Sequence, residues 1–511
     1  MLQRLTNSES IEVALHQITG LFRQYAEWFL SHGSNFTHSL RRDEIEITVF
    51  EQRLLLSCWT EQGIQTWRIL SWEWTSQSLV LQISRKVKTD QPLIELIPRA
   101  PALVVAATVR AAREIRCEKL ARLTADTFVD AKLERFSLSP GIHRGQPGKY
   151  ARIILRQRRR RIAITASVVA LQHSSVDAFL SSAILWFKRA GESSQIPIVE
   201  ELWLIVSEQV LRTLFYRVSL LREGLRKIVR IFITDNELAR LEERSCPSRE
   251  ELWHKRLSRF PPVPAATMTA LTSLIVQQAP EAIDVVYAGN GQTLRYFGLP
   301  FARIRSLLGE ERAWFGLDDA HRLLLERETV TALEQLLSDL REYRSAYAQD
   351  HRHALYRNAS EAWLESLLRK DITKLDPGLI IAPLHAQFRT THGGKLGIRP
   401  IDMLALRQDG RLVVIELKVS EDREHVLQGA DYWGRVEAHR RRGHIAKAKL
   451  FGNRSISDES PLVYLVAPTL RVHPSFETLV QCIDREIEVY RFDINEDWRA
   501  GVRVMRRVRV N

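Results

Sequence analysis

Residues 401–418, which read IDMLALRQDGRLVVIELK, decide the fold of the C-terminal part of this chain. Both ends of the stretch are rich in β-forming side chains, and Asp409-Gly410 lies between them. Asp-Gly is a strong signal for a tight turn between antiparallel strands. The stretch therefore predicts a hairpin with strands at 401–406 and 411–419, buried in a larger sheet.

Asp402 and Glu416 interrupt these two apolar runs. Ionised carboxylates are seldom buried without a partner, and a hard divalent cation that prefers oxygen ligands can compensate two of them. Lys418 lies two residues after Glu416, so both side chains leave the strand on the same side. A lysine there can orient a water or stabilise negative charge on phosphorus. The pattern predicts a metal site for phosphodiester cleavage; the alternative is a Glu-Lys pair on a solvated edge strand.

The flanking segments add polar groups at helical spacing. Upstream, residues 360–368 predict an amphipathic helix that carries Glu361 and Glu365 one turn apart, and either could reach the metal. Downstream, Gln428 and Tyr432 are four residues apart and lie on one face of the next predicted helix. The order is helix glutamate, strand aspartate, strand Glu-x-Lys and helix Gln-x-x-x-Tyr.

This order resembles the PD-(D/E)xK nuclease superfamily, most closely its RecB-like and NucS-like branches, over roughly residues 355–495. The resemblance implies a restriction-endonuclease-like α/β fold for residues 351–511. It also implies that helix and strand carboxylates surround one or two Mg²⁺ or Mn²⁺ ions, that the lysine activates the attack, and that the Gln-x-x-x-Tyr helix supports the site or the DNA. Carried onto this chain, these residues are Glu361, Asp402, Glu416, Lys418, Gln428 and Tyr432. Glu361 is preferred to Glu365 on its spacing to Gly378, and Ile401 departs from the motif proline, which stands at Pro400.

In the expected reaction the cation lies between Asp402, Glu416 and the carbonyl of Leu417, with Glu361 completing the shell. The chain is then a metal-dependent deoxyribonuclease of repair or defence. The competing hypothesis is a catalytically silent nucleic-acid-binding or scaffold protein that retains the nuclease fold. RNA as substrate, endo or exo cutting and strand preference all stay open. Relatives often dimerise, so the resemblance allows a homodimer.

Composition agrees with a nucleic-acid partner. Lys and Arg number 74 against 61 Asp and Glu, a net charge of +13 that favours a polyanion. The four cysteines are scattered without a CxxC grouping, which argues against zinc or a disulfide framework and fits a cytoplasmic protein. The chain has neither a long apolar run nor a Gly-rich phosphate loop, so we expect no membrane partner and no nucleotide cofactor.

Residues 126–260 predict a second α/β domain that is a degenerate copy of the nuclease core. Residues 151–168 can be laid without gaps on 402–419, which places Ala151, Thr165 and Ser167 at Asp402, Glu416 and Lys418. On this alignment the second copy has neither the two carboxylates nor the lysine of the C-terminal domain. The alternative is that two unrelated α/β sheets look alike in sequence.

Two groups of arginines are candidate phosphate contacts. One group lies at the hairpin of the degenerate copy, and the alternative for it is a solvated turn. The other follows Tyr432 and would form a positive rim beside the metal. The members are Arg156, Arg158, Arg159, Arg160 and Arg161 at the hairpin, and Arg435, Arg440, Arg441 and Arg442 at the rim.

Two further regions complete the predicted organisation. Residues 1–125 predict a β meander, with strands between 43 and 98, followed by a helix. Residues 261–350 predict a mainly helical connector with one hairpin near residue 290. The helices expected in the connector are 265–277, 302–308, 320–325 and 330–347.

Overall fold

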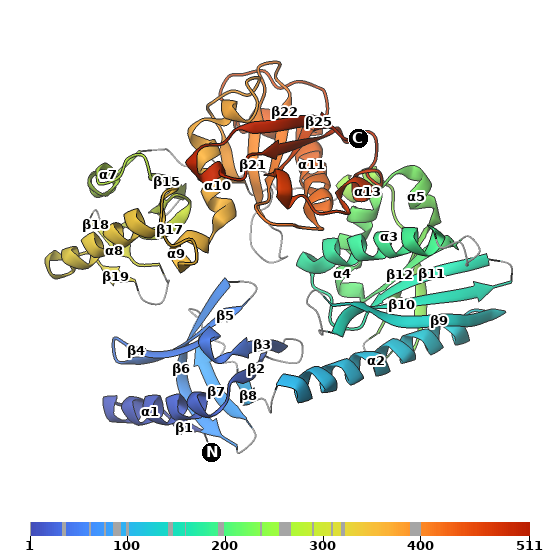
Figure 1. The fold of residues 1–511 in the computed structure, drawn as a ribbon, viewed down its shortest axis with the longest axis horizontal. Helices are drawn as coiled ribbons and strands as arrows, with labels where there is room; N and C mark the ends of the chain where they lie inside the picture. The colour runs from blue at the N-terminus through green and yellow to red at the C-terminus, as the bar shows by residue number, and fades with distance from the viewer. Residues whose placement is uncertain are drawn as a thin grey trace. The chain divides into compact units, whose positions relative to one another are not determined.

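The computed structural model shows a mixed α/β protein (Figure 1). It describes residues 2–32, 37–60, 63–75, 78–84, 93–98, 102–141, 147–158, 160–192, 199–235, 238–254, 267–288, 291–307, 310–317, 322–388 and 400–511. The chain divides into two compact units. One is built mainly from residues 1–112, and the other from residues 113–142, 148–313 and 334–511.

The first unit contains an eight-stranded sheet in the order β3-β2-β8-β7-β6-β5-β4, with β1 beside β6. Helix α1 packs against it through Ile11, Ala14, Ile18 and Phe22, which join Trp28 in one buried core. The expected meander corresponds to β4 through β8, whereas α1 was not predicted. The bounds are β1 (Gln3–Arg4), α1 (Ser8–Gln24), β2 (Glu27–His32), β3 (Thr37–Arg41), β4 (Ile45–Phe50), β5 (Arg53–Thr60), β6 (Gly63–Trp74), β7 (Leu79–Ser84) and β8 (Leu93–Pro98).

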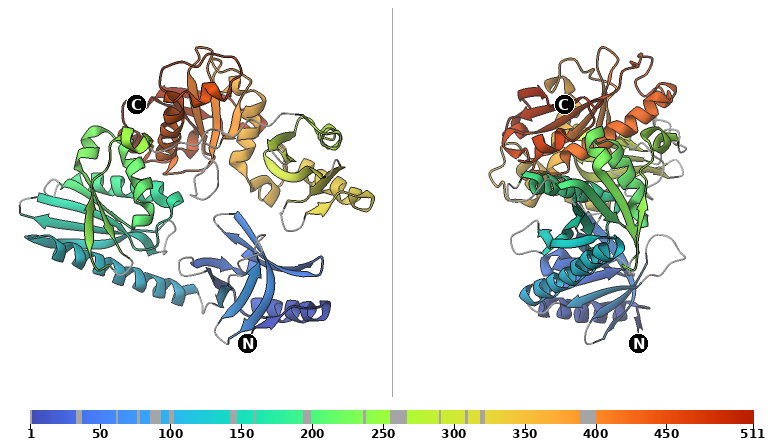
Figure 2. Two further views of the ribbon diagram at one scale, coloured as in Figure 1. Left: turned by 180° about the vertical axis from the view of Figure 1, so that it is seen from behind. Right: turned by 90° about the vertical axis from the view of Figure 1, so that its right-hand side faces the viewer.

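The middle sheet, in the second unit, has the order β9-β10-β11-β12-β13-β14. Helix α2 covers one face of it and α3 the other, as Figure 2 shows. The strands are β9 (Ala131–Pro140), β10 (Pro147–Gln157), β11 (Arg160–Ser167), β12 (Val199–Val206), β13 (Val229–Thr234) and β14 (Leu241–Arg244). The helices are α2 (Ala102–Thr127), α3 (Val176–Glu192), α4 (Glu208–Ser219), α5 (Glu223–Ile228) and α6 (Arg249–His254).

The C-terminal sheet has the order β20-β21-β22-β23-β24-β25. Helix α10 packs on one face and α11 on the other. The strands are β20 (His385–Phe388), β21 (Ile401–Leu406), β22 (Leu412–Leu417), β23 (Leu462–Pro468), β24 (Val489–Ile494) and β25 (Val504–Arg509). The helices are α9 (Ala354–Arg357), α10 (Ser360–Lys370), α11 (His425–Arg441), α12 (His444–Lys447) and α13 (Phe476–Val480).

The middle and C-terminal sheets have the same topology. In each, the second and third strands are antiparallel, the third, fourth and fifth are parallel, and the sixth is antiparallel to the fifth. A helix follows the third strand in both sheets, α3 in one and α11 in the other. The two sheets are therefore equivalent in topology, whereas their origin as two copies stays a prediction.

The gap-free alignment of the two hairpins is wrong by one residue in the first strand. Gln157 pairs with Arg160, so the middle hairpin has a two-residue turn, whereas Arg407 and Arg411 close a three-residue turn. Ala151, the residue aligned with Asp402, lies in the core on the α2 face of the sheet. The shorter turn shifts the first strand by one position, and a one-residue slip moves every side chain to the opposite face.

The prediction of a mainly helical connector is wrong. A five-stranded sheet occupies the region, in the order β15-β16-β17-β18-β19. Helices α7 and α8 were expected, but residues 302–307 fall in β17 and Leu323–Leu324 form β19. Residues 308, 320 and 321 of the expected helices lie outside the described residues. Arg303 and Arg305 alternate with the buried Ala302 and Ile304 there, which is the spacing of a strand. The bounds are α7 (Ala270–Gln277), β15 (Ile283–Ala288), β16 (Gly291–Tyr296), β17 (Leu299–Leu307), β18 (Glu310–Phe315), β19 (Leu323–Leu324) and α8 (Val330–Tyr343).

One hydrophobic core runs through the middle domain and the C-terminal domain. Val426, Leu427 and Trp433 of α11 belong to the same buried cluster as Phe179 of α3 and Leu214 of α4. Gly434 of α11 approaches α4 so closely that a Cβ there would lie 2.5 Å from the Tyr216 hydroxyl oxygen. Helix α11 is thus packed on both sides.

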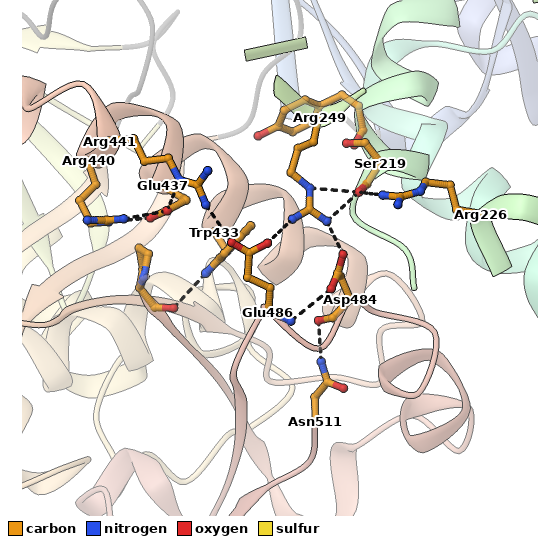
Figure 3. A network of polar contacts seen from close by, with 12 residues as sticks. Ser219, Arg226, Arg249, Trp433, Glu437, Arg440, Arg441, Asp484, Glu486 and Asn511 are labelled. Carbon is orange, nitrogen blue, oxygen red and sulfur yellow. Dashed lines mark hydrogen bonds and ion pairs between the residues drawn. The ribbon is translucent and has the colours of Figure 1, made fainter. Parts of the chain in front are cut away.

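Buried charges cross the same interface. Arg217 of α4 lies between Asp177 of α3, with Nε 2.5 Å from Oδ1, and Asp431 of α11. At the edge of the interface, shown in Figure 3, Arg249 contacts Asp484 and Glu486 at 2.5 and 2.6 Å. A buried ion pair needs well-placed partners to offset the loss of hydration, and Arg217 has a carboxylate on each side.

Candidate metal and nucleic-acid site

Asp402 and Glu416 lie on neighbouring strands of the C-terminal sheet. Met403 pairs with Ile415, so Asp402 and Glu416 are opposite each other one step further along the antiparallel ladder. Both lie on the face of the sheet that α11 covers, because Leu404 and Val414 pack against Tyr432. The backbone N–H of Leu417 donates to Asp402 Oδ2 at 2.9 Å. This bond fixes the Asp402 carboxylate at the end of the hairpin.

Lys418 brings a cation to these carboxylates. Its Nζ donates to Glu416 Oε1 at 2.8 Å and lies 3.7 Å from Asp422 Oδ2. Glu361, in the first turn of α10, lies 3.9 Å from the same Nζ through Oε2. The ammonium is therefore the point at which the helix glutamate and the strand carboxylates meet.

The electrostatics of the group show an excess of negative charge. Burial raises the pKa of Glu416 well above its ordinary value, and Asp402 raises it further. Burial also raises the pKa of Asp402, although Lys418 and a hydrogen bond from Leu417 oppose this. Burial alone would lower the pKa of Lys418, but Glu416, Glu361 and Asp402 together raise it. One ammonium does not balance the buried carboxylates.

The two helix glutamates have different environments. Glu365 is buried and accepts from Arg295 at 3.1 Å and from Gln387 Nε2 at 2.7 Å. Its charge is thus already compensated by the connector sheet, whereas Glu361 faces Lys418. Gln387 also opposes the rise in the pKa of Asp402, although burial raises that pKa overall. Sequence reasoning missed Gln387, because a lone glutamine on a short edge strand carries no motif.

Gln428 and Tyr432 lie on α11 over the same face, and both are buried. Gln428 Nε2 lies 3.4 Å from Glu424 Oε2, while its Oε1 has no hydrogen-bond partner. Burial raises the pKa of Tyr432, and Glu416 and Asp402 raise it further, which keeps the phenol protonated. His425, at the start of α11, contacts the carbonyl of Glu416 at 3.2 Å. These side chains form the α11 wall of the site.

The side chains have the donor chemistry for a hard divalent cation. Glu416 Oε2 is buried and has no hydrogen-bond partner. An unpaired carboxylate oxygen beside a second carboxylate is a site that Mg²⁺ or Mn²⁺ can compensate. Within the described residues no three His, Cys, Asp or Glu side chains are grouped as a metal site, and Glu361 Oε2 lies 3.9 Å from Lys418 Nζ. The Asp402–Glu416 pair can hold a cation. Glu361, the third carboxylate, contacts Lys418 and does not converge with the pair on one point.

The arginines expected at the hairpin of the middle domain are paired with carboxylates. Arg156 and Arg161 contact Glu134, Arg158 contacts Asp130, and Arg160 contacts Glu200 and Glu201. Arg159 lies outside the described residues. The acidic neighbours reduce the positive charge that this hairpin presents to solvent.

The arginines expected at the rim of the site are paired with carboxylate or carbonyl groups. Arg435 pairs with Asp431, and Arg440 and Arg441 pair with Glu437, as Figure 3 shows for the last two. Arg442 donates to the carbonyl of Trp253 in α6. These guanidiniums hold α11 in place. These four arginines therefore do not form a free phosphate-binding groove along α11.

Comparisons of the chain with protein-family models, curated proteins and solved structures find no match. In the part of the chain that the structure describes, no helix has both the length and the apolar character needed to cross a membrane.

Proposed function

We propose that this protein hydrolyses phosphodiester bonds of DNA with a divalent cation, Mg²⁺ or Mn²⁺, bound at Asp402 and Glu416. The observation that carries the proposal is the meeting of Asp402, Glu416, Lys418 and Glu361 at the end of the β21–β22 hairpin. A buried carboxylate pair with raised pKa values is costly to maintain, and such pairs are concentrated at functional sites.

Each side chain has a distinct part in the proposed reaction. Asp402 and Glu416 hold the cation, and Glu361 is the third carboxylate within reach of the group. When bound, the cation supplies charge stabilisation to the phosphate and lowers the pKa of a coordinated water. Lys418, which stays protonated, orients the attacking water and stabilises negative charge on the phosphate oxygens. Gln387 and the Leu417 N–H hold the Asp402 carboxylate in place.

The test is cleavage of end-labelled single-stranded, flapped and duplex DNA by the full chain, with Mg²⁺ or Mn²⁺ and with EDTA. Asp402→Ala and Lys418→Ala are compared with the wild type. Asp458→Ala is the matched control, because Asp458 is an exposed carboxylate of the same domain. We expect Lys418→Ala to lower the cleavage rate by about 10²- to 10³-fold, the range for removing one donor that stabilises negative charge in the transition state. Equal rates in all four proteins would contradict the assignment.

A second function, nucleic-acid binding without cleavage, is favoured by one specific observation. Lys418 Nζ already occupies Glu416 Oε1, and Glu361 is turned to the same ammonium, so three carboxylates do not converge on one point. A silent protein would bind DNA with strong salt dependence and cut none of the substrates in either metal. RNA in the same assay separates a deoxyribonuclease from a nuclease that accepts both polymers.

A further inference from the structure

Arg344 is a fully buried arginine that follows α8. Among the residues that the structure describes it has no carboxylate partner, and its guanidinium donates to backbone carbonyls instead. Phe297 accepts at 2.8 Å in the turn between β16 and β17, and Leu355 and Asn358 each accept at 2.7 Å in and after α9. A buried charge is costly unless its donors find acceptors, so these bonds tie the connector sheet to the segment that leads into α10.

The same guanidinium holds the residue that caps α10. The carbonyl of Ala359 accepts from Arg344 at 3.3 Å and from the backbone N–H of Trp363 at 3.0 Å. Ala359 has a φ of 48°, a left-handed conformation that is unfavourable for residues other than glycine and persists where the surroundings impose it. The guanidinium carbon of Arg344 also lies 4.8 Å from the centre of the Trp363 ring. Arg344 therefore fixes the place at which α10 begins.

Two further contacts hold the first turn of α10. Gly298, in the β16–β17 turn, lies so close that a Cβ there would be 2.0 Å from the carbonyl oxygen of Ala362. From the C-terminal domain, Arg499 donates to Ser360 Oγ at 3.0 Å. Glu361 stands between Ser360 and Ala362 in the chain, so its backbone is held on both sides.

The position of this turn determines what the Glu361 carboxylate can reach. The side chain is 45% exposed, and its Oε2 lies 3.9 Å from Lys418 Nζ. A carboxylate that binds a divalent cation must come within about 2.0 to 2.6 Å of it. A misplacement of about 1 Å in a group that supports a reaction can cost roughly 10²-fold in rate. The contacts of Arg344 and Gly298 are therefore within the range that decides the role of Glu361.

We propose that Arg344 is a positioning residue of the candidate site, which acts by holding the first turn of α10, and with it Glu361, against the connector sheet. The role toward a cation rests on the proposed nuclease function, whereas the fixed turn does not. The connector sheet then contributes to the site although none of its residues is a proposed ligand. Gly298 belongs to the same device, because only a residue without Cβ lets the β16–β17 turn approach α10 so closely.

The first test is Mn²⁺ binding to the full chain without DNA, followed by the electron paramagnetic resonance of free Mn²⁺. We expect Arg344→Lys and Gly298→Ala each to weaken binding by about tenfold, the lower end of the range for residues that orient metal ligands. Gly452→Ala is the matched control. Gly452 also has a positive φ, but a Cβ there would meet nothing within 4 Å, so this variant should bind Mn²⁺ as Gly298→Ala does not.

A double variant separates positioning from general damage to the fold. Glu361→Gln alone should weaken Mn²⁺ binding by about tenfold. Adding Gly298→Ala to Glu361→Gln should cause no further loss, because the effect passes through Glu361. An equal loss with and without the Glu361 carboxylate would overturn the proposal, since Gly298→Ala would then act on the whole domain.

Hydrogen exchange in EDTA tests the fixed turn without any metal. Gly298→Ala should speed amide exchange in residues 360–364 and leave β21 and β22 as in the wild type. Wild-type exchange throughout α10 would overturn the proposal, and Gly298→Ala decides this even if Arg344→Lys does not fold. Faster exchange in α10 with no Mn²⁺ binding by the wild type would support the fixed turn and contradict the proposed hydrolysis. Wild-type Mn²⁺ binding and DNA cleavage in Gly298→Ala would contradict the positioning role and leave the proposed hydrolysis standing.

Discussion

Two sheets of this protein share one topology and carry different side chains at the end of the hairpin formed by their second and third strands. The C-terminal sheet places Asp402 opposite Glu416, and the middle sheet places Arg152 opposite Thr165. The strands, the following helix and the covered face are the same in both. The comparison teaches that this framework does not depend on the charges at the end of its hairpin. Reversing one charge changes the kind of ion that the position attracts.

The largest effect should come from giving the C-terminal sheet the side chain of the middle sheet. Asp402→Arg places a guanidinium beside Glu416 and Lys418, where it would pair with Glu416 and exclude a divalent cation. We expect cleavage to fall below detection while oligonucleotide binding in EDTA is kept or strengthened. Cleavage is measured with the end-labelled DNA substrates in Mg²⁺ or Mn²⁺, and binding is measured with a fluorescein-labelled oligodeoxynucleotide in EDTA. Cleavage at the wild-type rate would show that the two sheets differ in some respect other than these charges.

A smaller effect should follow from removing the buried cation that links the middle domain to the C-terminal domain. Arg217→Met leaves Asp177 and Asp431 buried without their shared cation, and breaking such a group costs about 3 to 5 kcal/mol. The measurement is urea unfolding followed by tryptophan fluorescence, since Trp203 and Trp433 report the two sides. Arg230→Met, at a largely exposed ion pair, is the control. Separate transitions for the two domains in the wild type would contradict the continuous core.

The smallest effect concerns the hydrogen bonds of Glu437 on α11. Burial alone would raise the pKa of Glu437, but Arg440 and Arg441 lower it below its ordinary 4.5. A carboxylate with a lowered pKa stabilises the folded state above its unfolded pKa, and this contribution is lost as pH falls through the folded pKa. We expect Glu437→Gln to cost about 2 kcal/mol near neutral pH. The difference from the wild type should shrink below pH 4.5 in the same urea experiment.

Glu459→Gln is the matched control for that experiment. Glu459 is exposed and lies 3.3 Å from Arg411, so its ion pair is screened by water. A pH-independent loss in Glu437→Gln would mean that its side chain acts through packing and not through charge.

Local patterns were enough to predict the C-terminal hairpin and the order of the site residues. β-Forming residues around an Asp-Gly turn predicted β21 and β22. Helical spacing placed Glu361 and Glu365 on one helix and Gln428 and Tyr432 on the next, and the family resemblance favoured Glu361. The position of Arg152 could not be predicted in the same way. It depends on a turn that is one residue shorter, and an ungapped alignment hides such a change.

The other predictions that differ from the structure concern residues whose conformation or partner is determined by tertiary contacts. Residues 302–307 lie in β17, where Ala302, Arg303 and Ile304 pair with β16, so tertiary pairing overrides the expected helix. Glu437 precedes Arg440 and Arg441 by three and four residues, so helical spacing could have predicted this pairing. The contact of Arg441 with Glu486 could not be predicted, because Glu486 lies 45 residues away in sequence. Gln387 reaches Asp402 and Glu365 only through the sheet.

The double packing of α11 has a consequence for inheritance. One side of this helix bears Gln428 and Tyr432, and the other is closed by the middle domain through Trp433 and Gly434. A gene encoding residues 351–511 alone would remove Phe179 and Leu214 from the core that they share with Val426, Leu427 and Trp433 of this helix. The two domains can diverge in chemistry, but neither can be lost without exposing the other, so we expect them to be inherited as a pair.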